Sequence, residues 1–306
     1  MAKVIAWRLI QLPLILAVIY VLTFLLAWVA PGSPFEGERN MSPETLQALK
    51  ERFNADSAFS FLTTYPFRII TSGDFGPSLL YREWSVNDIL ATSLPVSITV
   101  GLFAMTIAIF VGVTVGALAA VKRNGLLDYG SMSITLIGIS LPSFVTAAVL
   151  LLVFSGWLKL FPVGSWGSIR DVILPGLALS LAPMAYIVRL QRVAMLDVLG
   201  SDYVRTARAK GLSTTTVIWK HCLRNAFLPV LSYLGPATAV TLTGSFVVEK
   251  VFNVPGLGQH FVNSVLNRDQ TLILGVVIVY SGLLLVMNLL VDICYTLIDP
   301  RIDLTK

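Results

Sequence analysis

Few residues of this sequence have the types and spacing that chemistry at a protein site requires. The chain has only two histidines, His221 and His260, which the topology inferred below puts on opposite sides of a membrane, so a histidine-based metal site or triad is not expected. The stretch GISLP at 138 to 142 is the nearest approach to a nucleophile elbow, and it lacks the second glycine. We therefore expect no catalytic residue and no metal ligand, and ordinary interfacial hydrogen bonds from both histidines.

Nucleotide chemistry is also missing from the chain. No run of the form G-x-x-x-x-G-K-[ST] occurs in it, although such a loop is what cradles the phosphates of ATP in P-loop proteins. We expect no cofactor on this chain, and any ATP used by it must be bound by another protein.

The densest positive charge lies in the stretch DYVRTARAKGLSTTTVIWKHCLRNAFLPV at 202 to 230. Ser201 or Asp202 can cap a short helix there, and Gly211 can end it in the left-handed conformation. Ser213 then caps a second helix, which leads toward Pro229 at the start of the next apolar run.

The first of these short helices has the character of a docking surface. Arg205 and Arg208 share one side, while small residues keep the remaining surface shallow. A basic helix resting on anionic lipid is the alternative. Lipid would favour large apolar residues opposite the charges, whereas Ala207 and Ala209 supply almost none, so docking of a protein is the favoured interpretation.

The rest of the chain is apolar enough to be embedded in a membrane. Of its 306 residues 56% are hydrophobic and 13% charged, with a mean hydropathy of +0.80. Helices about 20 residues long can cross a bilayer with their backbone groups satisfied. The six uncharged runs are Leu9 to Ala30, Val96 to Val121, Tyr129 to Leu158, Val172 to Val188, Phe227 to Val248 and Thr271 to Val291. The prediction is an all-α polytopic membrane protein with six transmembrane helices.

The first apolar run has two interpretations. Lys3 and Arg8 precede it, as in a signal peptide, but its 22 residues exceed a cleavable apolar region, and Trp28 stands where a small residue is wanted. A retained helix is favoured.

Lysine and arginine set the orientation, because they gather in cytoplasmic loops. With the amino terminus inside, thirteen fall in cytoplasmic segments and four in the two short outer loops. We therefore expect both termini and the loop at 189 to 226 to be cytoplasmic. The net charge of +5 follows from the same anchoring residues, and no nucleic acid is expected as a partner.

Residues 31 to 94 form the longest connection. Ser42 and Pro43 are expected to start a short helix, and SGDFGPS at 72 to 78 is typical of turns. Asp74 and Asp88, with Pro255 and Gly256 of a later loop, are candidates for docking an external protein. A structural cap over the outer mouth is the alternative.

Prolines and glycines within the apolar runs indicate helices that change their packing. Pro142, Ser143, Pro183 and Met184 are the candidates for a gate. Ordinary kinks explain the prolines equally well.

The eight residues from Arg205 to Leu212 resemble the cytoplasmic loop signature of ABC importer permeases, in the variant of the oligopeptide and dipeptide group. Gly211 and Leu223 match the generic signature, whereas Arg205, His221 and Arg224 replace its Glu, Ile and Pro, as is typical of the peptide branch. Further matches are APGSPF at 30 to 35, GDFGPS at 73 to 78, SVNDILATSLPVS at 85 to 97, VFNVPGLGQHFVNSVLNRD at 251 to 269 and IDPR at 298 to 301.

This resemblance implies a type I ABC importer (MetI-like) permease of the bacterial inner (cytoplasmic) membrane. Residues 1–94 would be an amino-terminal helix with an extracytoplasmic segment, and residues 95–306 a five-helix permease domain. The implied partners are a second homologous permease, two cytoplasmic ATPases that use ATP and Mg, an extracytoplasmic peptide-binding protein, the peptide and membrane lipid. The residues implied to contact the ATPase are Arg205, Thr206, Ala207, Arg208, Ala209, Lys210 and Gly211.

Other cargoes and another class of transporter stay open. The same permease group serves dipeptides, nickel, glycosides and antimicrobial peptides. An ion-coupled secondary transporter would also be a bundle of apolar helices, but it usually needs ionisable groups at mid-membrane. Glu249 and Asp292 lie only at the ends of the fifth and sixth runs, which favours an ATP-driven importer.

Overall fold

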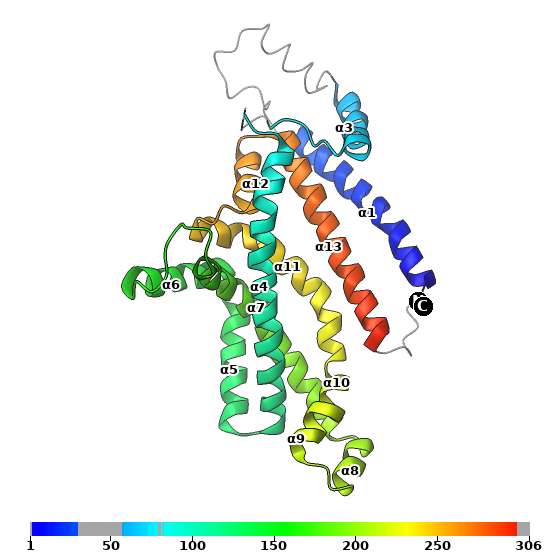
Figure 1. Cartoon of the computed structure of the whole chain (residues 1–306), viewed down its shortest axis with the longest axis vertical. Coiled ribbons are helices and arrows are strands. Elements are labelled where there is room, and N and C mark those ends of the chain that lie inside the picture. The colour runs from blue at the N-terminus through cyan, green and yellow to red at the C-terminus, as the bar shows by residue number, and fades with distance from the viewer. Residues whose placement is uncertain (1, 30–56, 79–80, 82, 299–306) are drawn as a thin grey trace. The chain divides into compact units, whose positions relative to one another are not determined.

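A computed structural model describes residues 2–29, 57–78, 81 and 83–298 (Figure 1), with side chains left out at 2–6, 239–240, 243–244 and 295–298. The expected helix at Ser42 and Pro43 lies outside these residues.

The described residues form helices joined by short connections, and they contain no strand beyond an isolated bridge between Pro77 and Ser85. The all-α prediction is therefore confirmed. The helices are α1 (Ala2–Val29), α3 (Ala58–Ser72), α4 (Val86–Val121), α5 (Leu126–Ser140), α6 (Ser143–Leu150), η1 (Leu151–Trp157), α7 (Ile169–Leu199), α8 (Asp202–Ala209), α9 (Thr214–Thr216), η2 (Val217–Cys222), α10 (Leu223–Ala226), α11 (Leu228–Phe252), α12 (Leu257–Leu266) and α13 (Gln270–Ile298).

The contacts divide the chain into two compact units. Of the described residues, unit 1 contains 98–254 and 287–298, and unit 2 contains those within 2–97 and 255–286. Unit 1 therefore holds the helices from α5 to α11, and unit 2 holds α1, α3 and α12.

Four described helices are long and apolar enough to cross a membrane, namely Trp7–Val29, Val86–Val121, Ile169–Leu199 and Gln270–Cys294. A fifth candidate is the pair Leu126–Ser140 and Ser143–Trp157, whose two parts are bent by 106°. These spans within the described residues agree with a multi-pass membrane protein.

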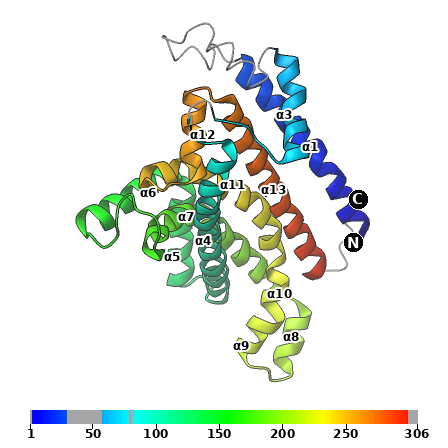
Figure 2. The same cartoon turned by 45° about the horizontal axis from the view of Figure 1, so that its top comes forward.

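The third apolar run is not the single helix that its length predicts. It breaks after Ser140, where Leu141 adopts an extended backbone with φ −88° and ψ 126° and Pro142 becomes the amino-terminal cap of α6. The residue before a proline is pushed out of the helical region, and proline has no N–H with which to continue the helix. The two halves therefore diverge within unit 1 (Figures 1 and 2).

Two helices extend beyond their apolar runs because polar residues cap them. Ser85 accepts a hydrogen bond from the backbone nitrogen of Asp88, and Asp88 accepts one from that of Ser85, so α4 begins ten residues before Val96, at Val86. Ser168 and Asp171 form the same capping box on α7, which begins at Ile169, three residues before the run at Val172.

Glycine lets α4 approach α7 closely. A Cβ atom on Gly116 would lie 2.6 Å from the backbone oxygen of Val188, and one on Gly112 would lie 2.7 Å from the Cγ2 atom of Ile187. Gly138 of α5 likewise faces Ala185 at 3.3 Å. Glycine at these positions therefore allows the close helix contact that small residues permit in membrane bundles.

Candidate functional site: the helix at 202 to 209

The loop that carries the basic stretch folds into short helices at one end of unit 1 (Figures 1 and 2). Ser201 is the cap residue of α8, although its hydroxyl donates back to the carbonyl of Val198 at 2.6 Å. Gly211 follows the helix with φ +76°, and the hydroxyl of Ser213 accepts a hydrogen bond from the backbone nitrogen of Thr216. Helix α8 and the cap at Ser213 lie where the sequence predicts them, whereas Ser201 makes no side-chain cap bond and the second helix is divided into α9, η2 and α10.

An apolar cluster holds α8 against the long helices of unit 1. Val204 and Ala207, which are 0% and 6% exposed, point into it from α8. The other buried members come from α4, α7, η2 and α10, and they are Ala120, Met195, Val217, Cys222 and Ala226. Because the ends of α4 and α7 meet the same cluster, α8 has a packed connection to both.

The side chains of α8 divide into an inner and an outer set. Arg205, Thr206, Arg208, Ala209 and Lys210 are exposed, as is Gly211. Ala207 is turned inward, so its side chain is not available to a partner. Arg205 makes one exposed ion pair of 3.3 Å with Asp202, and such pairs contribute about 0.2–1 kcal/mol, so the outer surface stays basic.

A polar contact ties α8 to the chain that leads into α11. The side-chain nitrogen of Asn225 donates to the hydroxyl of Tyr203 at 2.9 Å, and that hydroxyl donates a long bond of 3.5 Å to the carbonyl of His221. The sequence analysis missed this contact, because Tyr203 and Asn225 are 22 residues apart. The hydrogen bond between Asn225 and Tyr203 fixes the orientation of α8 on the apolar cluster beneath it.

An ion pair braces the same end of unit 1. The guanidinium of Arg192, in α7, donates from Nε and Nη2 to both carboxylate oxygens of Asp128, in α5, at 2.5 and 2.8 Å. Asp128 is 2% exposed, and it also accepts from the backbone nitrogen of Asn124 at 3.0 Å. The basic turn at 122 to 123 and the basic loop at 189 to 226 thereby lie at one end of unit 1.

Sequence reasoning had only a weak signal for this ion pair. Asp128 stands one residue before an uncharged run. Arg192 is one of the thirteen basic residues expected in cytoplasmic segments, and nothing in the sequence indicates its partner. A buried carboxylate requires a positively charged partner. The sequence therefore indicates that a buried Asp128 would have such a partner, but not which residue it is.

Cys222 belongs to the apolar cluster and is fully buried. Burial raises the pKa of its thiol above the ordinary value, and the charge of Arg208 opposes this only in part. A thiol with a raised pKa is a poor nucleophile at neutral pH, so Cys222 packs as a small apolar residue.

The candidate gate residues lie on two packed helices of unit 1. Pro142 and Ser143 stand at the break after α5, one turn beyond Gly138, which contacts α7 near Leu181 and Ala185. Pro183 is buried inside α7. Met184 lines an apolar cavity of about 460 Å³ between α4, α5 and α7, whereas Pro142 and Ser143 do not line it.

The four candidate docking residues all belong to unit 2, but they do not form one cluster. Asn87, which precedes Asp88, holds the turn that contains Asp74. Its side chain accepts a hydrogen bond from the backbone nitrogen of Phe75 and donates one to the carbonyl of Gly73. Pro255 and Gly256 instead precede Leu257, whose nitrogen donates to Ser97 at 2.9 Å. Ser97 is about 13 Å farther along α4 than Asp88.

The surroundings of the two histidines indicate that both have a structural role. His260 packs edge-to-face on Tyr81 with ring centroids 5.2 Å apart, and burial lowers the pKa of its imidazole. His221 is half-buried in η2. Among the described residues no three or more His, Cys, Asp or Glu side chains could hold a metal ion.

Comparison with known proteins gives this architecture a context. Residues 112–304 match the family described as the binding-protein-dependent transport system inner membrane component. The chain is 46% identical to the dipeptide transport system permease protein DppB of Bacillus subtilis (strain 168), with 94% of each covered. It is 42% identical to the oligopeptide transport system permease protein OppB of Haemophilus influenzae and 41% identical to that of Escherichia coli (strain K12), with 99% of each covered.

A solved structure shares the fold. The crystal structure of an amino acid ABC transporter with histidines aligns with a TM-score of 0.50 and 19% identity, covering 68% of this chain and 92% of that one.

Proposed function

The chain belongs to the binding-protein-dependent transport system inner membrane component family, and from that premise we propose that it is the permease subunit of an ATP-driven peptide importer. The observation that carries the proposal is the near full-length identity of 41–46% with dipeptide and oligopeptide permeases. The protein is a multi-pass component of the inner membrane.

Coupling to ATP hydrolysis is assigned to α8. Its exposed residues Arg205, Thr206, Arg208, Ala209 and Lys210 form the surface that contacts a cytoplasmic ATPase, and Gly211 sets the bend behind it. Ala207 contributes by seating α8 on the apolar cluster. The packing of Val204 and Ala207 on Met195 and Ala226 supports this role, because a push on α8 then reaches α7, and α10 at the start of the chain into α11, through close contacts.

The proposed orientation places α8 and both termini in the cytoplasm. The basic turn at 122 to 123 supports it, since the ion pair between Arg192 and Asp128 holds that turn at the same end of unit 1 as α8. At the opposite end of unit 1, Gly164 contacts Asn253, which joins the two short outer loops.

The proposed complex contains a second homologous permease, two cytoplasmic ATPases that bind ATP and Mg, and an extracytoplasmic peptide-binding protein. This chain supplies half of the channel and no nucleotide site. Pro142, Ser143, Pro183 and Met184 are the proposed gate, which the break after α5 supports. Asp74 and Asp88, with Pro255 and Gly256 of the connection between α11 and α12, are the proposed dock for the binding protein.

Peptides are the proposed cargo, and selectivity is assigned to the binding protein. Dipeptides, nickel, glycosides and antimicrobial peptides are the alternatives within the group. An ion-coupled mechanism is not favoured by the described helices. Asp128 is ion-paired in the first turn of α5, Glu249 lies in the last turn of α11, and Asp292 lies two residues before the end of the span Gln270–Cys294.

The test is uptake of a labelled peptide into proteoliposomes that contain the complete complex. We expect uptake to require enclosed ATP and the binding protein, and to be unchanged by proton and sodium ionophores. Uptake that proceeds without ATP and collapses with an ionophore would establish the secondary transporter instead. Charge reversal at Asp74 and Asp88 tests the dock separately, by the affinity of the binding protein for the complex.

A further inference from the structure

Helix α3 of unit 2 packs against the part of α1 that is expected to lie in the membrane. The ring of Tyr65 stacks on Tyr20 with centroids 6.1 Å apart, and Phe61 stacks on Phe24 at 5.9 Å. The hydroxyl of Tyr20 also donates to the carbonyl of Leu62 at 3.1 Å. Tyr20 precedes Val29, the last residue of the span, by about 13 Å along the helix axis, so α3 packs beside the expected span and not beyond its end.

The outer face of α3 is suited to lipid. Phe59, Phe67 and Ile70 are 75%, 69% and 83% exposed, and their spacing puts them on the side opposite Phe61 and Tyr65. Arg68 is the only charged residue among the 15 of this helix. A helix with large apolar residues on one face and a cation on the other is typical of the membrane interface.

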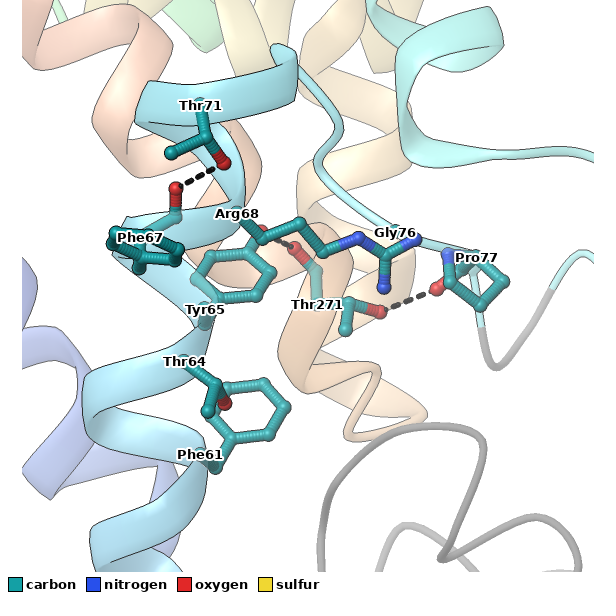
Figure 3. A pocket seen from close by; sticks show the side chains of 9 residues that line it. All are labelled: Phe61, Thr64, Tyr65, Phe67, Arg68, Thr71, Gly76, Pro77 and Thr271. Carbon is teal, nitrogen blue, oxygen red and sulfur yellow. Dashed lines mark hydrogen bonds between the residues drawn. The ribbon is translucent and has the colours of Figure 1, made fainter.

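A cavity of about 320 Å³ opens beside this helix, between α3, residues 76–77 and the first turn of α13 (Figure 3). Its walls are fixed by hydrogen bonds: the hydroxyl of Tyr65 donates to the carbonyl of Thr271 at 2.9 Å, and the hydroxyl of Thr271 donates to the carbonyl of Pro77 at 2.7 Å. Phe67 belongs both to the cavity and to the exposed face, so the cavity opens toward the surface that lipid covers.

One charged side chain, Arg68, lines this cavity, and its ion-pair partner Asp74 lies beside it. The guanidinium of Arg68 reaches across it toward Gly76 (Figure 3) and donates from Nε to Asp74 at 2.8 Å. The two side chains remain 40% and 41% exposed. Burial tends to raise the pKa of Asp74, but hydrogen bonds from Arg68 and from the Gly76 nitrogen outweigh it and lower the pKa, so the carboxylate is charged at neutral pH.

We propose that this cavity binds the headgroup of a zwitterionic phospholipid, with the phosphate on Arg68, the ammonium on Asp74 and the acyl chains along Phe67 and Ile70. Arginine suits a phosphodiester because its planar guanidinium offers paired donors. A neighbouring carboxylate attracts the ammonium of an ethanolamine headgroup and repels a headgroup that is purely anionic. The inference goes beyond the proposed function, since it requires only that the chain is embedded in a membrane, and it gives Asp74 a ligand other than the binding protein. An Asp74→Asn variant that lowers the affinity for the binding protein but keeps the discrimination between lipids would assign Asp74 to the dock and overturn its role at this cavity.

The bound lipid would join two consecutive parts of unit 2. Its headgroup would bridge α3 to the turn at 74 to 77, while the acyl chains cover the outer face of α3. Docking of α3 against α1 is then strengthened by a molecule that only the membrane supplies.

The test uses the complete importer, purified and stripped of lipid in detergent, with thermal unfolding and native mass spectrometry as readouts. Phosphatidylethanolamine is expected to raise Tm and to remain bound, with phosphatidylglycerol much weaker and soluble phosphoethanolamine without effect. Arg68→Gln is expected to weaken phosphatidylethanolamine binding about tenfold, the loss typical of a charge-assisted hydrogen bond. Arg170→Gln, which removes a cation from the first turn of α7, is the matched control and should leave binding unchanged.

Asp74→Asn separates this proposal from a purely structural role of the ion pair. It removes the charge but keeps an acceptor for the Gly76 nitrogen, so discrimination between the two lipids should disappear while the protein still folds. Equal binding of both lipids by the unaltered protein would overturn the proposal, as would unchanged lipid binding in Arg68→Gln. A response to soluble phosphoethanolamine as large as that to the lipid would assign the cavity to a soluble ligand.

Discussion

Asn225 donates a hydrogen bond of 2.9 Å to the hydroxyl of Tyr203, and this bond joins the helix that points outward from unit 1 to the short helix that leads into α11. Apolar packing alone holds two helices together but allows them to slide. A directional bond at the edge of such a cluster fixes the rotation of one helix against the other.

Removal of the hydrogen bond between Asn225 and Tyr203 should reduce the coupling of peptide uptake to ATP hydrolysis more than it reduces the stability of the protein. Tyr203→Phe keeps the ring but removes the hydroxyl, and an exposed hydrogen bond contributes only about 0.5–1.5 kcal/mol to stability. We therefore expect a small fall in Tm and a larger fall in peptide taken up per ATP hydrolysed, measured in proteoliposomes. Asn225→Ala should reproduce the effect, and the double variant should be no worse than either single one. Trp219→Phe, an exposed aromatic of the same loop, is the control.

Gly211 tests the bend behind α8. Its φ of +76° suits glycine, and no atom lies within 4 Å of the position of a Cβ, so a substitution acts through the backbone alone. Gly211→Val should lower peptide uptake while the ATPases still turn over, because a β-branched residue strongly disfavours this conformation. Gly211→Asn tolerates it and should retain most uptake. Normal uptake and normal peptide-stimulated ATPase activity in Gly211→Val would contradict the assignment of this loop.

The ion pair between Asp128 and Arg192 should contribute strongly to the stability of the end of unit 1 that carries α8. Asp128→Asn leaves the guanidinium without its charged partner in a largely buried place, and breaking such a pair costs about 3–5 kcal/mol. The expected result is a clear fall in Tm and faster proteolysis at residues 122 to 125. Asp197→Asn, an exposed acid of α7, should have little effect. An equal Tm for the two variants would show that the pair is not stabilising.

Close packing of α4 on α7 predicts a difference between two glycines. At Gly116 a Cβ would meet a backbone oxygen at 2.6 Å, whereas at Gly130 it would meet nothing within 4 Å. Gly116→Ala should destabilise the protein by about 1–3 kcal/mol through overpacking. Gly130→Ala should be neutral or stabilising, since alanine has the higher helix propensity. Thermal unfolding in one detergent compares the two directly.

The thiol of Cys222 should react slowly with alkylating reagents. Its pKa is raised by burial, so the thiolate is scarcer at any pH below that value, and access is blocked as well. In a Cys294→Ser background we expect modification at least about tenfold slower in the folded protein than in dodecyl sulfate. Because the folded pKa is raised, this burial stabilises the fold below the ordinary pKa, and the contribution is lost as pH rises through the folded value. Equal rates in both conditions would mean that the cluster is open.

The sequence predicted the position of α8 and the cap of α9 because local chemistry determines them: Gly211 and Ser213 act on neighbouring residues. The partners of Asp128 and Tyr203 could not be predicted, since they depend on which helix ends meet. Helix α3 was also missed, because aromatic residues that pack on another helix give no regular signal of their own. The sequence indicates a gate or a kink at Pro142, but it does not predict that the run divides into two helices. An apolar run shows how much chain can lie in the membrane, and it does not show where a helix changes direction.

The break at Leu141 and Pro142 limits the stability of this subunit in a membrane when no other protein covers it. In the isolated chain Leu141 is 41% exposed, and Pro142 cannot supply the N–H that an unbroken helix would give to the carbonyl of Gly138. Backbone of that kind is tolerated at membrane depth only beside protein or water, not beside acyl chains. An orphan copy, synthesised without the other subunits, would therefore expose a defect to the bilayer and should be short-lived in the cell, whereas a copy covered by a neighbour would persist.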